Sequence, residues 1–209
     1  MRIKNAASPE LFRTYTVGGH ANYNCFIWEA ARATTAALTF FKSISIRGKD
    51  GLEEEFCDGG LKWNNPVQVV IKEGEKVFGP KRRVACIVSI GTGHQSAIGL
   101  KHANWYQALL PENAINLLKD LATDCEDKAE ECQKRYGDVP SLYSRFNVDH
   151  GLEEVSWADW DMLGDVKTHT RSYLEKQLVD QKLDQLVDIL RTRQGNVTTA
   201  ELSTVQISH

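Results

Sequence analysis

The sequence predicts an α/β fold in which a partly parallel sheet is flanked by helices. Helical and extended segments alternate along the chain, as they do in α/β domains. The run from Val84 to Ile90 is almost continuously apolar and β-branched, which is typical of a strand buried on both faces of a parallel sheet. The 209 residues are 42% hydrophobic, enough for one core of ordinary size. In such folds, functional residues lie beyond the carboxyl ends of strands.

The first third of the chain predicts a helix, an extended segment and a turn. Ile27 to Leu38 is rich in alanine and is expected to be helical. Phe40 to Ile46 is β-branched and aromatic, and is expected to be extended. Gly48 to Gly51 has the composition of a turn. Phe56-Cys57 then leads into Asp58-Gly59-Gly60, as a strand would that ends in a tight turn with one carboxylate.

The middle of the chain contains a helix with clear start and stop signals. Asn65 is the expected N-cap, Pro66 fits the first helical position, and Gly79-Pro80 ends the helix. Its buried face is predicted from residues at helical spacing, namely Val67, Val70, Ile71, Val77 and Phe78. Gly91-Thr92-Gly93 lacks the third glycine of a dinucleotide-binding motif and is expected to be a strand-to-loop turn.

The second half predicts two long helices around a strand. Pro111 to Gly137 is amphipathic, Leu142 to Val148 alternates like a strand or an extended edge, and Asp165 to Arg193 is the last helix. Residues 194–209 show no periodicity and are expected to be disordered. We therefore expect one domain over residues 1–193, with a helical extension, followed by a tail.

Composition excludes several classes of function. The net charge of −3 argues against broad electrostatic binding to nucleic acid, and no apolar run is long enough for a membrane span. The first residues lack the apolar stretch of a secretory signal, so we expect none, and the odd number of cysteines favours reduced thiols in a cytoplasmic protein. No spacing of cysteines or histidines indicates a metal site, so we expect neither a metal nor another cofactor.

Asp58 is the residue most suggestive of chemistry, and three roles are open to it. It could bind a metal, but a single carboxylate without neighbouring ligands makes a poor site. It could accept hydrogen bonds from the amides of its own turn, which is the commonest role of an Asp-Gly pair. It could also act as a catalytic base, provided that a nucleophile lies within hydrogen-bonding distance.

Four segments, in this order, resemble the patatin-like phospholipase family. They are IWEAARATTAALTFF from Ile27, DGGLKWNNP from Asp58, VACIVSIGTG from Val84, and the long stretch from Arg145 to Lys176, which is similar to the end of such domains in fungal proteins. The resemblance covers Leu11 to Lys176 and implies a three-layer fold of which this chain holds the C-terminal part. It also implies the hydrolysis of lipid acyl esters by a Ser-Asp dyad, with Asp58 as the base in the motif completed by Gly59 and Gly60.

The sequence departs from the family pattern in its nucleophile. No G-x-S-x-G occurs in these residues, and neither does the glycine-rich oxyanion loop of the family. Thr35 and Leu38 also replace a serine and a proline of the family pattern. We therefore expect a partial domain that is inactive alone and needs its missing half, with a lipid or acyl ester as substrate of the completed enzyme.

Two other interpretations remain open. The chain could be a non-catalytic descendant of the family that binds or scaffolds. It could also be an unrelated serine hydrolase that uses Ser89 or Ser96 with His94, although no elbow motif supports this. In the partial-domain interpretation, missing strands would leave the edges of the sheet unpaired, so we expect marginal stability and self-association.

Overall fold

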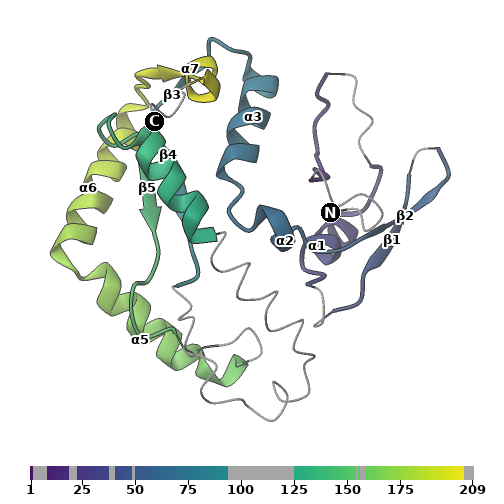
Figure 1. The fold of residues 1–209 in the computed structure, drawn as a ribbon, viewed down its shortest axis with the longest axis horizontal. Helices are drawn as coiled ribbons and strands as arrows, with labels where there is room; N and C mark the ends of the chain where they lie inside the picture. The colour runs from purple at the N-terminus through teal and green to yellow at the C-terminus, as the bar shows by residue number, and fades with distance from the viewer. Residues whose placement is uncertain are drawn as a thin grey trace. The chain divides into compact units, whose positions relative to one another are not determined.

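The computed structural model describes residues 1, 9–18, 23–37, 41–48, 50–93, 125–153, 155 and 159–204 (Figure 1). Over these residues the chain mixes helices with short strands, which agrees with the predicted α/β class. The chain divides into two compact units. Unit 1 contains Met1–Pro66 and Leu110–Asp124, and unit 2 contains Val67–Leu109 and Cys125–His209.

Unit 1 begins with helix α1 (Ile27–Thr34), which confirms most of the helix expected there. The main-chain N–H of Phe26 donates to the Glu29 carboxylate at 2.7 Å, so an acidic side chain in the first turn caps the start. The helix ends earlier than Leu38. The Thr35 hydroxyl donates to Ala31 O at 2.9 Å, a local bond that competes with further helical bonds.

A hairpin and a short helix complete the elements of unit 1. Strands β1 (Ile44–Arg47) and β2 (Glu53–Phe56) pair antiparallel, and the expected turn between them is closed by a bond of 3.1 Å from Gly51 N to Gly48 O. Helix α2 (Gly60–Trp63) follows. The core packs Ala33 of α1 against Ile46 and Phe56 of the hairpin, with the rings of Phe12 and Tyr23 beside Phe56.

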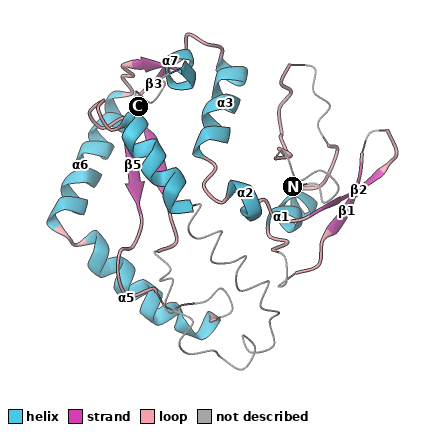
Figure 2. Cartoon of the chain, in the orientation of Figure 1, coloured by secondary structure: helices cyan, strands magenta, loops and turns pink. Residues whose placement is uncertain are grey.

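Unit 2 contains the other elements, shown by type in Figure 2. They are α3 (Val67–Phe78), β3 (Arg83–Val84), β4 (Ile87–Ile90), the helical residues 125–136, β5 (Tyr143–Phe146), the 3-10 helix η2 (Trp160–Met162), α5 (Leu163–Leu174), α6 (Gln177–Thr192), β6 (Val197–Thr198) and α7 (Thr199–Thr204). Strands β4 and β5 pair parallel, which confirms a parallel component, and β3 pairs antiparallel with β6. The described strands thus form separate two-stranded ladders rather than one larger sheet.

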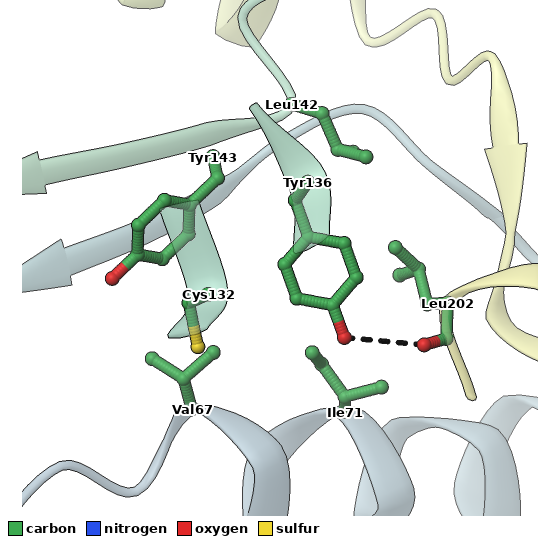
Figure 3. Close-up of a cluster of buried hydrophobic side chains, with 7 residues drawn as sticks. All are labelled: Val67, Ile71, Cys132, Tyr136, Leu142, Tyr143 and Leu202. Carbon is green, nitrogen blue, oxygen red and sulfur yellow. Dashed lines mark hydrogen bonds between the residues drawn. The ribbon is translucent and has the colours of Figure 1, made fainter. Parts of the chain in front are cut away.

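The core of unit 2 lies between α3, the helical residues 125–136, β5 and α7 (Figure 3). Its buried members are Val67, Ile71, Cys132, Tyr136, Leu142, Tyr143 and Leu202. Val67 and Ile71 lie one turn apart on α3 and face the side chains of Cys132 and Tyr136. The Tyr136 hydroxyl donates to Leu202 O at 3.1 Å, so the one polar atom of this buried ring is satisfied.

Two burial patterns differ from the prediction. Val84 to Ile90 is split into β3 and β4, and Ile90 is 78% exposed. Strand β4 has one described neighbour, β5, so only one of its residues, Ser89, is buried. The predicted face of α3 is buried at Val67 and Ile71 but exposed at Val70 and Phe78, because the core contacts only part of the helix.

The C-terminal elements also differ from the prediction. The long helix from Asp165 to Arg193 is two helices, α5 and α6, because Lys176 between them has an extended backbone and pairs with Asp149 at 2.7 Å. Of the tail expected to be disordered over residues 194–209, residues 197–204 form β6 and α7, and residues 205–209 lie outside the described residues. This segment is held in place because β6 pairs with β3 and because Leu202 is buried, with 2% of its surface exposed.

Candidate functional site

Asp58 lies just beyond the end of β2 in unit 1, where the sequence predicts a carboxylate at a strand end. The neighbouring Cys57 pairs with Met1 in both directions: Cys57 N donates to Met1 O at 2.9 Å, and Met1 N donates to Cys57 O at 2.7 Å. Asp58 N donates to Ala36 O at 2.9 Å, a residue that follows α1. These bonds hold the main chain of Asp58, although its strand belongs to an antiparallel hairpin and not to a parallel sheet.

The Asp58 carboxylate is tied to its own turn. Its Oδ1 accepts the N–H of Gly60 at 2.7 Å, so it satisfies one free amide at the start of α2. A Cβ on Gly60 would lie 3.2 Å from this oxygen, closer than most side-chain contacts allow. Gly60 therefore fits a position where the carboxylate approaches the backbone closely. This bond is the structural role that the sequence left open for Asp58.

The second oxygen of Asp58 is the atom available for chemistry. Among the described residues, Oδ2 accepts no hydrogen bond, and the side chain is half-buried. No described serine is hydrogen bonded to Asp58 either. The described part of unit 1 thus presents a carboxylate with one free oxygen and a fixed backbone, to which no described serine is hydrogen bonded.

The alternative nucleophiles are not activated in the described structure. Ser89 of β4 is 6% exposed, and its hydroxyl accepts the Arg145 guanidinium at 3.0 Å, so it faces a cation and not a base. Ser96 and His94 lie outside the described residues. All five cysteines are free thiols, as expected, and burial raises the pKa of Cys57 beside Asp58, which keeps that thiol protonated.

A polar pocket in unit 2 was not predicted from the sequence. Its volume is about 250 Å³, and it lies beside β5, α6 and the end of the helical residues 125–136. The polar residues that line it include Gln133, Ser141, Ser144, Lys182 and Gln185. Only Lys182 and Gln185 share a helix face, at a spacing common to any polar helix surface, so sequence alone offered no signal for the site.

Comparison with known proteins found no relative of this chain. No family model, curated protein or solved structure matches this chain. Within the described ranges, no cluster of three His, Cys, Asp or Glu side chains could hold a metal ion, and no helix is long and apolar enough to cross a membrane. The resemblance to the patatin-like family thus depends on the sequence segments quoted above.

Proposed function

We propose that this chain is the base-bearing part of a patatin-like lipid acyl hydrolase domain, with Asp58 as the base. The four segments in family order support the family, and the geometry of Asp58 is compatible with its role. The observation that carries the proposal is the free Oδ2 on a carboxylate whose main chain and other oxygen are already fixed. Such fixation limits the movement of the carboxylate. Its Oδ2 therefore keeps one orientation, from which it would accept a proton.

The chemistry of the completed domain follows from the dyad. A serine hydroxyl attacks the carbonyl carbon of an acyl ester and passes its proton to Asp58, and the tetrahedral intermediate then expels the alcohol, which takes up that proton. Water hydrolyses the acyl-serine by the same proton transfers. An aspartate of ordinary pKa, about 3.9, is a weak base, so the completed pocket must exclude water to make it stronger. The serine and the oxyanion donors come from residues outside this sequence.

The 209 residues alone are therefore expected to hydrolyse no ester. The test is release of p-nitrophenol from a p-nitrophenyl ester, with and without a serine-directed phosphonate. Loss of the nucleophile and of the oxyanion donors each lowers turnover by orders of magnitude. Activity that the phosphonate abolishes would contradict the proposal.

The role of Asp58 is tested in a longer chain that carries a G-x-S-x-G segment, if the reading frame ahead of the Met1 codon encodes one. Asp58→Asn should lower its turnover at least a hundredfold, because it removes the base and keeps the shape. Asp50→Asn is the matched control, since Asp50 Oδ1 accepts the N–H two residues later, at 3.1 Å, as Asp58 does. Equal loss in both variants, or in neither, would exclude Asp58 as the base.

A non-catalytic binding module is the second candidate. It is favoured by the way unit 2 closes its own core with α7, which a fragment lacking half its domain need not do. Exposed apolar side chains on the same unit, such as Ile90 and Phe78, favour instead the self-association expected of a fragment. Sedimentation velocity at micromolar concentration separates the two: a stable monomer supports the module, and concentration-dependent dimers or larger species support the fragment.

A further inference from the structure

The pocket of unit 2 contains a partly buried ammonium group, that of Lys182. Lys182 Nζ donates to Arg145 O at 3.1 Å and lies 5.4 Å from the centre of the Phe146 ring. Among the described residues, no carboxylate pairs with it. Burial lowers the pKa of Lys182, which is the effect expected of a cation that has lost water without gaining an anion.

The pocket also lies along the edge of β5 that faces away from β4. Ile87 N donates to Leu142 O at 2.6 Å and Gly91 N donates to Phe146 O at 2.8 Å, so even-numbered residues of this stretch pair with β4. Because the pattern of a parallel ladder alternates, the main-chain groups of Tyr143 and Arg145 face the other edge. Arg145 O is the acceptor of Lys182, whereas the N–H of Tyr143 has no backbone partner among the described residues.

Further donors line the same space. Ser141 and Ser144 supply hydroxyl groups, and Gln133 and Gln185 supply amides, from three separate segments of the chain. Ser141 has a φ of +60°, a conformation that is uncommon for a non-glycine residue and recurs at binding and active sites. The pocket thus combines one cation, several neutral donors and a strained residue.

We infer that this pocket binds the carboxylate or phosphate group of a small molecule, with Lys182 as its charged partner. An oxyanion would neutralise the ammonium and accept hydrogen bonds from the hydroxyls and amides. These bonds would be stronger than bonds to water, because the acceptor is charged. The volume of about 250 Å³ is below that of typical pockets for drug-sized ligands, so the ligand is a small acid or a small phosphate ester. This inference is independent of the role of Asp58.

The test uses the full chain and two probes, sodium succinate and sodium phosphate, with sodium chloride at equal ionic strength as the control. Amide shifts in ¹H–¹⁵N spectra should saturate for at least one probe, with a Kd of about 1 mM or lower. The shifts should centre on the Tyr143 amide and the side-chain amides of Gln133 and Gln185. Saturation by succinate alone identifies a carboxylate ligand, and saturation by phosphate alone identifies a phosphate ligand. Shifts that do not saturate, or that chloride reproduces, overturn the inference.

Two pairs of variants connect the binding to Lys182. Lys182→Gln removes the charge and keeps a donor for Arg145 O, and it should weaken binding at least tenfold. Its control is Lys167→Gln on the exposed face of α5, which should leave binding unchanged. Gln185→Glu places a carboxylate in the pocket and should abolish binding, whereas Gln177→Glu at the start of α6 should not. Circular dichroism establishes that each variant is folded. Unchanged affinity in folded Lys182→Gln or Gln185→Glu would refute the site.

Discussion

Replacing Leu202 by alanine tests whether the C-terminal segment belongs to the core of unit 2. Leu202 is 2% exposed, and it packs in the cluster that contains Ile71 of α3 and Tyr136. Truncation of a buried leucine to alanine costs about 2–5 kcal/mol, from lost burial and from the cavity left behind. Helix α7 has only six residues and can move to fill part of that cavity, so we expect about 3 kcal/mol.

Urea unfolding followed by far-UV circular dichroism measures this loss. With a slope of about 2 kcal/mol per molar urea, the midpoint should fall by about 1.5 M. Leu178→Ala is the control, because Leu178 lies on α6 and is 80% exposed, so its midpoint should move by less than about 0.3 M. If Leu202→Ala unfolds at the same urea concentration as Leu178→Ala, α7 is not docked and the reasoning about the core is wrong.

Two further predictions concern backbone strain and pH. Gly79 follows α3 with a φ of +80°, so Gly79→Ala should lower the free energy of unfolding by about 1 kcal/mol, while Gly74→Ala inside α3 should raise it by about 0.5–1 kcal/mol. No atom lies within 4 Å of the added Cβ at either position, so opposite shifts in urea midpoint isolate the backbone term, and shifts of the same sign would contradict it. Burial lowers the pKa of Lys182, so between that value and the unfolded value of about 10.4 the unfolded chain binds more protons and stability rises with pH. The slope of the unfolding free energy over this window should be larger in the parent than in Lys182→Gln, and equal slopes would show that Lys182 titrates as it does in water.

Local signals in the sequence predicted the elements better than their burial. The signals at Pro66 and Gly79 located α3 to within one residue: the helix begins at Val67, one residue later than predicted, and Gly79 follows its end with a positive φ. Neither signal depends on distant residues. Burial depends on the neighbours that an element finds. Val84 to Ile90 looks like a central strand, yet in the described structure β4 has one neighbour and Ile90 is exposed.

Residues 197–204 also could not be predicted from local signals, because their neighbours lie far away in the sequence. Val197 and Thr198 pair with Val84 and Arg83, more than a hundred residues earlier, and a strand of two residues has no periodicity to detect. Leu202 is buried in a cluster with residues far away in the sequence, such as Ile71 and Tyr136. The turn that carries Asp58 could be predicted from the sequence, because its side-chain hydrogen bond joins residues that are only two positions apart.

The two candidate sites lie in different units of the structure, so their tests are independent. Asp58 is held by bonds to Gly60 and Ala36, which belong to unit 1. Lys182 and the residues around its pocket belong to unit 2. Asp58→Asn should therefore leave the binding of succinate or phosphate unchanged, and Lys182→Gln should leave the Asp58 turn intact. An inactive chain that binds an oxyanion would support the site in unit 2 without distinguishing the two candidate functions, because both expect the chain alone to be inactive. A chain that hydrolyses esters only with a supplied serine segment, and loses this with Asp58→Asn, would support the hydrolase whether or not the pocket of unit 2 is occupied.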